Sequence, residues 1–131
     1  MKITVSIPCY RSAKTLPYVV EQIKKTVAQR PSYSYQIILV NDCSPDNTFD
    51  VIRSLCQEDE NIVGVNLSRN WGQATARMAS IPYIEGDCTV FMDDDGQHPI
   101  DHLFDLVDKI EEGYEIGRAS CRERVKKAMI W

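Results

Sequence analysis

The sequence predicts an α/β protein with a mostly parallel sheet and helices on both faces. Short runs rich in Ile and Val alternate with stretches whose apolar residues recur every three or four positions. The unusual polar residues gather just after the short runs rather than within them. A chain of 131 residues that is 44% hydrophobic is long enough for one globular domain with a real core.

Four short runs have the composition of strands that are buried on both faces of a sheet. Each run is too short for a helix and is rich in β-branched residues. They are residues 3–7, which Pro8 closes, and residues 36–40, 62–67 and 88–92. Buried strands of this kind are typical of parallel sheets.

The stretches that follow these runs have the apolar period of amphipathic helices. They are residues 16–27, 49–56, 74–81 and 99–110. In the third, Ala74, Met78 and Ile81 carry the repeat, and in the fourth, Pro99 lies near the first turn and Gly113 ends the helix. The resulting β-α-β-α-β-α-β-α order predicts parallel strands joined by right-handed crossovers.

Charge and cysteine content narrow the classes of partner and compartment. Acidic residues outnumber basic ones over residues 1–117, which argues against a nucleic-acid surface. The five cysteines, an odd number without C-x-x-C spacing, favour neither a disulfide framework nor a zinc cluster, so a reducing cytoplasm is expected. No signal peptide and no apolar run of membrane-spanning length is present in these residues.

Four loops are expected at the carboxyl ends of the strands, where open α/β sheets bind their ligands. They are residues 8–12, 41–48, 68–72 and 93–98. Neither G-x-G-x-x-G nor G-x-x-x-x-G-K-[ST] occurs, so the usual dinucleotide and P-loop solutions are excluded.

Three consecutive carboxylates, Asp93, Asp94 and Asp95, follow the fourth predicted strand. Like charges this close repel one another, and a cation relieves the repulsion. Oxygen ligands suit Mg²⁺ or Mn²⁺ bound together with substrate phosphates. The alternative is an acidic turn that caps the next helix, and His98 fits such a cap or a wall better than a metal site.

The second and third loops carry two further candidates, each with a structural alternative. Asp42 could accept a hydrogen bond from a nucleobase or ribose, or could belong to an Asx/Pro turn before a helix that Asp46 or Thr48 caps. Arg69 has the fork that suits a diphosphate, although by itself it could be a surface arginine at a helix start.

The four loops and the residues beside them form four motifs in register. They are V-S-I-P-C-Y-R-S at 5–12, V-N-D-C-S-P-D-N-T at 40–48, L-S-R-N-W-G-Q at 67–73 and F-M-D-D-D-G-Q-H-P at 91–99. Taken together, these motifs resemble the donor-binding half of a family 2 glycosyltransferase with the GT-A fold. They are most similar to the branch that moves a sugar from a nucleotide to a polyprenyl phosphate, such as dolichyl-phosphate mannosyltransferase and its undecaprenyl-phosphate relatives.

The resemblance assigns roles to eight residues. It implies that Pro8, Tyr10 and Asp42 line the nucleoside pocket, that Arg69 contacts a diphosphate or the acceptor phosphate, and that Asp94 lies in the donor site less directly. It implies that Asp93, Asp95 and Gln97 hold Mg²⁺ or Mn²⁺. No catalytic residue is assigned, because the acceptor half of the family's domain would follow these motifs.

The implied reaction is inverting transfer from a UDP- or GDP-linked sugar to an acceptor, expected to be undecaprenyl or dolichyl phosphate, with a divalent metal. The full-length enzyme would work at the cytosolic face of a membrane. It would reach the membrane through segments that follow residue 131. Two alternatives remain open: a truncated module that binds a sugar nucleotide without turnover, and a nucleotidyltransferase, although residues 8–12 lack the Gly- and Lys/Arg-rich loop of that class.

The carboxyl-terminal residues differ in character from the rest. We assign residues 1–115 to the donor-binding part of the domain, interpret residues 116–125 as a sequencing-adapter artefact and leave residues 126–131 unassigned. The alternatives for this segment are a basic surface helix or a membrane-facing basic patch. Its basic residues are Arg118, Arg122, Arg124, Lys126 and Lys127, against the single acid Glu123.

Overall fold

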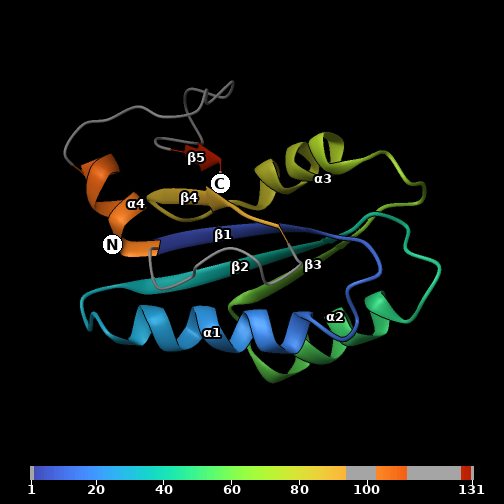
Figure 1. Cartoon of the computed structure of the whole chain (residues 1–131), viewed down its shortest axis with the longest axis horizontal. Coiled ribbons are helices and arrows are strands. Elements are labelled where there is room, and N and C mark those ends of the chain that lie inside the picture. The colour runs from blue at the N-terminus through green and yellow to red at the C-terminus, as the bar shows by residue number, and fades with distance from the viewer. Residues whose placement is uncertain (1, 94–102, 112–127, 131) are drawn as a thin grey trace.

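A five-stranded parallel sheet forms the centre of the molecule in a computed structural model, which describes residues 2–93, 103–111 and 128–130 (Figure 1). The strand order is β3-β2-β1-β4-β5, and each neighbouring pair is parallel. The strands are β1 (Lys2–Cys9), β2 (Ser34–Asn41), β3 (Ile62–Asn66), β4 (Cys88–Phe91) and β5 (Ala128–Ile130). The predicted parallel sheet is thus confirmed.

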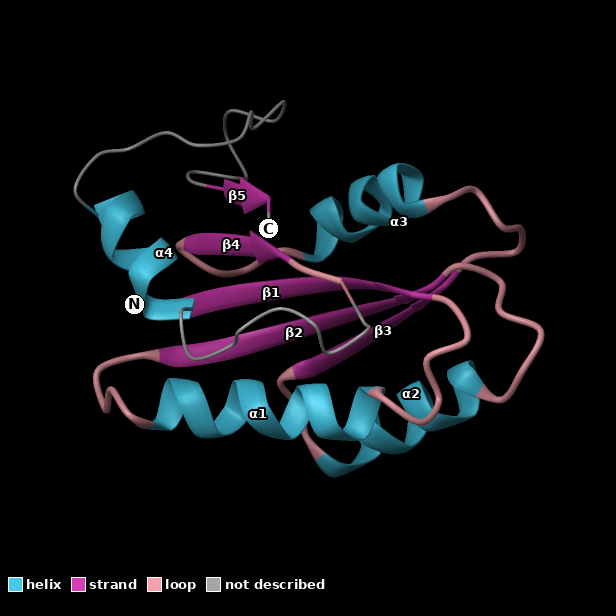
Figure 2. Cartoon of the chain, in the orientation of Figure 1, coloured by secondary structure: helices cyan, strands magenta, loops and turns pink. Residues whose placement is uncertain are grey.

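Helices cover both faces of this sheet, with α1 and α2 on one side and α3 on the other (Figure 2). The buried residues of α4 belong to the same core cluster as those of α1 and α2. The helices are α1 (Leu16–Ala28), α2 (Thr48–Glu58), α3 (Gln73–Ser80), the short 3₁₀ helix η1 (Ile81–Tyr83) and α4 (Leu103–Glu111). The predicted start of the last helix, at residues 99–102, lies outside the described residues.

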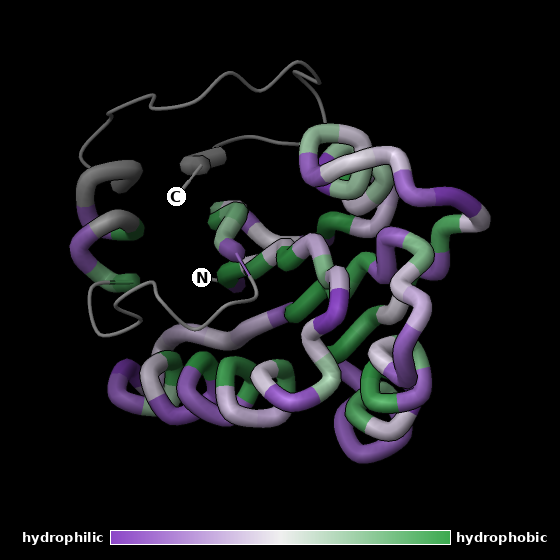
Figure 3. The backbone as a smooth tube through the Cα atoms, turned by 45° about the vertical axis from the view of Figure 1, so that its right-hand side comes forward, coloured by the Kyte–Doolittle hydropathy of each residue, from purple (hydrophilic) through white to green (hydrophobic). Residues whose placement is uncertain are grey.

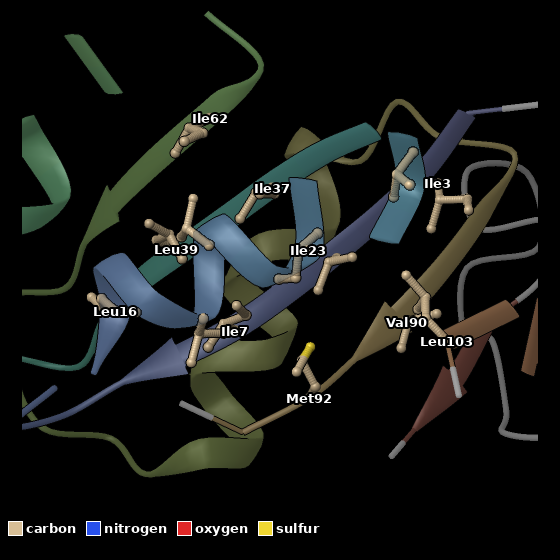
Figure 4. Packing of buried hydrophobic residues seen from close by; sticks show 14 of the residues in the cluster. Ile3, Ile7, Leu16, Ile23, Ile37, Leu39, Ile62, Val90, Met92 and Leu103 are labelled. Atoms are coloured by element: carbon tan, nitrogen blue, oxygen red, sulfur yellow. The ribbon is translucent and has the colours of Figure 1, made fainter. Parts of the chain in front are cut away.

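The face covered by α1 and α2 is a continuous apolar core (Figure 4). Ile3, Val5 and Ile7 of β1 are fully buried there against Leu16 and Ile23 of α1. Hydrophobic residues gather in the central strands, while α1 alternates between hydrophobic and hydrophilic residues (Figure 3). Burial of a large aliphatic side chain stabilises a fold by about 1.5–3 kcal/mol, so this face is the main source of stability.

The face covered by α3 contains buried polar side chains that hydrogen-bond to one another. The Thr4 hydroxyl donates to Gln36 Oε1 at 2.8 Å, and Gln36 Nε2 donates to the Tyr83 carbonyl at 2.8 Å. The Ser6 hydroxyl donates to that of Ser80 on α3 at 2.7 Å. Because buried polar groups cost little only when they are paired, this network holds η1 and α3 against the sheet.

Pro8 does not end the first strand, contrary to the prediction. It lies within β1 and pairs in register with Val40 of β2. The Cys9 carbonyl accepts the Asp42 N–H on the β2 side at 2.9 Å, so the preceding Pro8 faces the β4 side. The pairing of β1 with β4 ends where Ser6 lies opposite Phe91, two residues before Pro8. Proline has no N–H to donate, and at this position the sheet does not need one.

The buried face of α3 also differs from the predicted one. Met78, a member of the predicted apolar stripe, is 65% exposed, whereas Ala76 and Ser80 are fully buried. Small residues let a helix approach the sheet closely enough for the contact between Ser80 and Ser6. Hydrophobic periodicity therefore identified the helix but not the side that packs.

Residues 128–130 form β5 beside β4, in a segment to which the sequence analysis assigned no structure. Residues 112–127, which include the interpreted artefact at 116–125, lie outside the described residues.

One arginine joins α4 to the turn between α1 and β2. Arg30 Nη1 and Nη2 donate to the two carboxylate oxygens of Asp108 at 2.7 and 3.0 Å. Its guanidinium also lies 4.0 Å from the ring centroid of Phe104, which contacts the Tyr33 ring edge to face at 5.5 Å. These contacts hold α4 in place at the amino end of the sheet.

The strand order places a topological switch point between β1 and β4. From β1 the chain proceeds outward to β2 and β3 and then returns to the other side of β1 to form β4. Loops diverge at such a point and leave room for a ligand at the carboxyl ends of the strands. The loops that follow β1 and β4 flank this position.

Candidate functional site

Hydrogen bonds tie together the loops after β1, β2 and β3. The Arg11 N–H donates to Ser44 Oγ at 2.9 Å, and the Ser12 N–H donates to Thr48 Oγ1 at 3.0 Å. On the other side, the Leu67 N–H donates to the Asn41 carbonyl at 2.9 Å. The three loops thus form one connected edge, as expected for the carboxyl ends of neighbouring parallel strands.

The loop after β1 presents an aromatic ring to solvent. Pro8 is buried within the strand, whereas Tyr10 is 40% exposed. Arg11 adopts a positive φ of 54°, and its guanidinium lies 5.6 Å from the centroid of the Tyr10 ring. The Tyr10 N–H donates to Ser12 Oγ at 3.0 Å, which fixes the backbone beneath the ring.

The loop after β2 forms a turn that leads into α2, as the structural alternative proposed, but the N-cap residue is Asn47 and not Asp46 or Thr48. Asp46 Oδ1 accepts the Thr48 N–H at 3.1 Å, and the hydroxyls of Ser44 and Thr48 donate to the same carboxylate. These hydrogen bonds, with that from Ser44 the strongest, lower the pKa of Asp46. Asp46 therefore stays ionised at the first turn of α2, where the helix dipole favours a negative charge.

Asp42 is not part of that turn but points toward the third loop. Its side chain is buried, with only 5% of the residue exposed. Oδ1 accepts the Trp71 N–H at 2.8 Å, and Oδ2 accepts the Gly72 N–H at 3.0 Å. A buried carboxylate with two backbone donors fixes the entry to α3, because Gly72 is the residue that precedes that helix.

The loop after β3 carries a second exposed aromatic residue with an arginine beside it. Trp71 is 54% exposed, and the Arg69 guanidinium lies 5.7 Å from its ring centroid. Gly72 has a φ of 92°, a conformation that suits glycine and starts α3 directly after the tryptophan. Arg69 itself is exposed, as a ligand-binding arginine would be.

Asp93 is the one residue of the acidic triplet that the structure describes. It lies two residues after the end of β4, and its Oδ1 lies 3.5 Å from Arg77 Nη2. The two side chains are only 29% and 24% exposed. Asp94, Asp95 and Gln97 lie outside the described residues.

Arg77 is a site residue that the sequence analysis did not identify. It lies on α3, and its Nε is buried without a hydrogen-bond partner in the part of the chain that the structure describes. Arg77 lies three residues after Ala74 and four before Ile81, so on the helix it is a neighbour of the predicted stripe. Its partner Asp93 is 16 residues away, and no local pattern in the sequence pairs the two.

The donor atoms present fit a hard divalent cation in type, since Asp93 supplies carboxylate oxygen. Within residues 2–93, 103–111 and 128–130, no group of three His, Cys, Asp or Glu side chains is close enough to hold a metal ion. The Asp93 carboxylate is shared with Arg77, so the other oxygen ligands of a metal site would have to come from residues such as Asp95 and Gln97.

This edge of the sheet therefore combines exposed aromatic rings, three arginines and a half-buried carboxylate around a switch point. Aromatic rings can stack on a planar heterocycle. Arginines can bind phosphate oxygens in pairs, and a carboxylate can bind a metal that bridges those oxygens. The chemistry suits a metal-bound nucleoside diphosphate.

Comparison with known protein families gives a match over most of the chain. The profile described as "Glycosyl transferase family 2" matches residues 4–127. The chain is 34% identical over 130 residues to the undecaprenyl-phosphate 4-deoxy-4-formamido-L-arabinose transferase of Shewanella sediminis, covering 97% of this chain and 38% of the relative. The protein of the same name from Proteus mirabilis is 34% identical over 124 residues, and the match covers 94% of this chain and 38% of that relative. The chain thus spans 38% of the length of these relatives.

Solved structures share the fold at lower identity. S. aureus TarS 1–349 in complex with UDP-GlcNAc matches with a TM-score of 0.67 and 24% identity, covering 86% of this chain and 32% of that one. The mannosyltransferase PcManGT from Pyrobaculum calidifontis, in complex with GDP-Man and Mn²⁺, matches with a TM-score of 0.71 and 20% identity. The match covers 88% of this chain and 33% of that one. At these identities the likeness concerns the fold alone.

Proposed function

Because the chain belongs to glycosyl transferase family 2, we propose that it forms the donor-binding part of an enzyme that transfers a sugar from a nucleoside diphosphate to a polyprenyl phosphate. The GT-A fold expected from the sequence is confirmed by the solved structures that share it. The curated relatives are named for transfer to undecaprenyl phosphate, which supports this class of acceptor.

The placement of Asp93 is the observation that carries the proposal. It lies at the carboxyl end of β4, beside the switch point and within an ion pair with Arg77 on α3. A carboxylate there can approach the diphosphate only through a cation, because two anions repel one another. Mg²⁺ or Mn²⁺ held by Asp93, Asp95 and Gln97 would supply that link and would stabilise the departing nucleoside diphosphate.

The remaining residues are proposed to bind and orient the donor. Tyr10 and Asp42, with the buried Pro8 behind them, would border the nucleoside, and Asp94 would lie next to the metal ligands. Arg69 and Arg77 would balance the negative charge of the diphosphate or the acceptor phosphate. A UDP-linked or a GDP-linked donor fits this chemistry equally well.

The reaction we propose is a single displacement with inversion. An oxygen of the acceptor phosphate forms a bond to the anomeric carbon, and the bond from that carbon to the diphosphate oxygen breaks. The bonding pair leaves with the nucleoside diphosphate. Since a phosphate acceptor is already anionic, the step needs no strong general base.

We propose that the full-length enzyme works at the cytosolic face of a membrane, where a polyprenyl phosphate is accessible. None of the helices in the described part of this chain is long and apolar enough to cross a bilayer. We propose that contact with the membrane involves segments beyond the matched region, since the matched relatives are longer than this chain.

Calorimetric titration of the chain with UDP and with GDP, in the presence and absence of Mn²⁺, tests the proposal. We expect binding of one nucleotide that Mn²⁺ strengthens, and loss of that strengthening in Asp93→Asn and Asp95→Asn. Glu58→Ala, which removes an exposed acid at the far end of α2, is the matched control and should bind as the parent does. A folded sample that binds neither nucleotide would refute the proposal.

A second candidate is a module that binds a sugar nucleotide without transfer. The matched region covers 38% of the relatives, and no residue of this chain has an assigned role in activating the acceptor. An assay with a polyprenyl phosphate and radiolabelled UDP- and GDP-sugars separates the two candidates. Nucleotide binding without any glycolipid product would favour the binding module.

A further inference from the structure

We propose that Trp71 forms a wall of the nucleoside pocket against which the base stacks, and that Asp42 is the positioning residue that holds Trp71 there. The inference rests on the proposed function, because it concerns the nucleotide of the same site. It adds a base-binding residue that the motif comparison did not assign and gives Asp42 a second role.

The first argument is that Trp71 is exposed although its backbone is fixed. The ring lies on a loop between β3 and α3, and 54% of the residue is exposed. Its N–H donates to Asp42 Oδ1 at 2.8 Å, and the next N–H, of Gly72, donates to Oδ2 at 3.0 Å. Because the buried carboxylate fixes the backbone at Trp71, the indole keeps only its own side-chain rotations, and less freedom is lost on binding a flat ligand than on a free loop.

The second argument is that Asp42 connects Trp71 to Tyr10. The Asp42 N–H donates to the carbonyl of Cys9, the residue before Tyr10, at 2.9 Å. The backbone on one side of Asp42 thus leads to the tyrosine, while its carboxylate on the other side holds the tryptophan. Two exposed aromatic residues therefore flank one buried carboxylate at the carboxyl ends of β1 and β2.

The third argument is the charge beside each ring. The guanidinium of Arg69 lies 5.7 Å from the Trp71 centroid, and that of Arg11 lies 5.6 Å from the Tyr10 centroid. A base that stacks on either ring would bring its phosphates toward these cations. An aromatic ring next to a cation therefore matches a ligand that is flat at one end and anionic at the other.

The role of Asp42 in holding Trp71 is compatible with a contact to the nucleoside. An ionised carboxylate has about four lone-pair sites, and the two backbone N–H groups each occupy one. Stacking on Trp71 is tolerant of base identity, because every base has a π face. Any discrimination between uracil and guanine would therefore come from polar contacts and not from the indole.

Intrinsic fluorescence provides the direct test, since the sequence contains two tryptophans, Trp71 and Trp131. In a Trp131→Phe background, Trp71 is the only indole. We expect the nucleotide that calorimetry shows to bind, UDP or GDP, and its nucleoside to change this emission with Mg²⁺ present. Inorganic diphosphate with Mg²⁺ should leave it unchanged. Mg²⁺ replaces Mn²⁺ here because the paramagnetic ion itself quenches fluorescence.

Affinity measurements complete the test. Trp71→Ala should weaken binding of that same nucleotide about 10- to 100-fold, the range that loss of one base stack produces. Trp71→Phe should weaken it less than about threefold, because the phenyl ring still stacks. Tyr83→Ala removes an aromatic side chain that is 48% exposed on η1, away from the site, and should leave the affinity unchanged.

A double-mutant cycle tests the positioning role of Asp42. If Asp42 acts through Trp71, Asp42→Asn combined with Trp71→Ala should weaken binding clearly less than the product of the two single effects. Asp42→Asn should also shift the emission of Trp71 in the free protein, which a merely stabilising residue elsewhere would not do. Circular dichroism checks that each variant is folded, and Asp42→Glu replaces Asp42→Asn if the latter unfolds.

The outcomes separate this inference from the proposed function. If calorimetry detects UDP or GDP binding while Trp71 fluorescence is unchanged and Trp71→Ala binds normally, the inference is wrong and the proposed function stands. If the loss of affinity in the double variant equals the product of the losses caused by Asp42→Asn and Trp71→Ala alone, Asp42 does not act through Trp71, and its positioning role is wrong. Absence of any nucleotide binding by the folded chain contradicts the proposed function and this inference together.

Discussion

On the α1 and α2 face of the sheet, β1 presents Ile3, Val5 and Ile7, whereas on the α3 face the same strand presents Thr4 and Ser6. All five side chains are fully buried. One face is held together by apolar contact, whereas the other combines a smaller apolar cluster around Ile38, Val40 and Ala76 with hydrogen bonds of neutral side chains. Alternation of apolar and polar residues along a strand thus indicates here two buried faces of different chemistry, and not one buried and one solvated face.

The different chemistry of the two faces also affects the candidate site. The apolar face supports the sheet, while the polar face brings a short helix with small residues close to it. Through Ser80 and its neighbours, α3 delivers Arg77 to Asp93 at the end of β4. A helix that packed through large apolar side chains would lie further from the sheet and would hold this arginine away from the carboxylate.

Two adjacent isoleucines of β2 offer the largest test of the comparison. Ile37 faces the large apolar cluster and Ile38 faces α3, and both are fully buried. We expect Ile37→Ala to cost about 4 kcal/mol and Ile38→Ala about 2–3 kcal/mol, because the thinner α3 face can collapse into the space left. Urea unfolding of both variants measures the two costs, and equal costs would mean that the faces contribute alike.

Two glycines provide the next test. A methyl group on Gly86 would meet Thr4 Oγ1 at 2.4 Å and backbone atoms of Thr4 and Lys2 at 2.8 and 2.9 Å. On Gly64 it would meet only the side chains of Ile52 and Cys56, at 2.8 and 3.2 Å. Gly86→Ala should therefore destabilise by about 3 kcal/mol and Gly64→Ala by about 1 kcal/mol, since side chains yield more easily than backbone. Thermal melting in parallel would show whether this order holds.

The hydrogen-bond network itself is tested by Gln36→Leu. This change keeps the volume roughly constant but leaves the Thr4 hydroxyl, the Glu85 N–H and the Tyr83 carbonyl without the Gln36 partner. We expect a loss of about 2 kcal/mol, the cost of unpaired buried polar groups. Gln57→Leu on the exposed side of α2 serves as the control. If urea unfolding gave the two variants equal stability, the network would not be what holds η1.

The smallest expected effect is on the pH dependence of unfolding, through Tyr35, which packs partly buried against the apolar cluster. Burial, together with a hydrogen bond to Asp59, raises the pKa of Tyr35 to about 12. Because the neutral phenol is favoured in the folded state, its contribution is complete below the unfolded pKa of about 10 and is lost as pH rises through 12. Tyr35→Phe should flatten the pH dependence of unfolding between these values. An unchanged slope there would assign the alkaline loss to other groups.

The sequence predicted the parts of the molecule that depend on local patterns. The four strands, their helices and the carboxyl-edge loops follow from runs of Ile and Val, helical spacing and the order of elements. The turn in which Asp46 accepts the Thr48 N–H also follows from residues two positions apart, although the N-cap residue of α2 is Asn47.

What the sequence did not reveal depends on residues distant in the chain. The backbone partners of Asp42 lie 29 and 30 residues away, and Arg77 is 16 residues from Asp93. Neither separation has a periodic signature. The packing side of α3 was mistaken because close approach through Ala76 and Ser80 outweighed the burial of Met78, which periodicity alone could not weigh.

The position of β1 in the sheet also has a consequence for the order in which the chain folds. β1 precedes β2, β3 and β4 in the chain, yet its partner on one side, β4, is the last of these four strands, and the Lys2 N–H meets the Asp87 carboxylate across 85 residues. During synthesis, β1, β2 and β3 can pair while one edge of β1 stays open. Closing such a distant pair is entropically slow. The pairing of Arg77 with Asp93 is therefore expected among the last steps of folding, and the open edge of β1 is where a nascent chain would be most exposed to association with another.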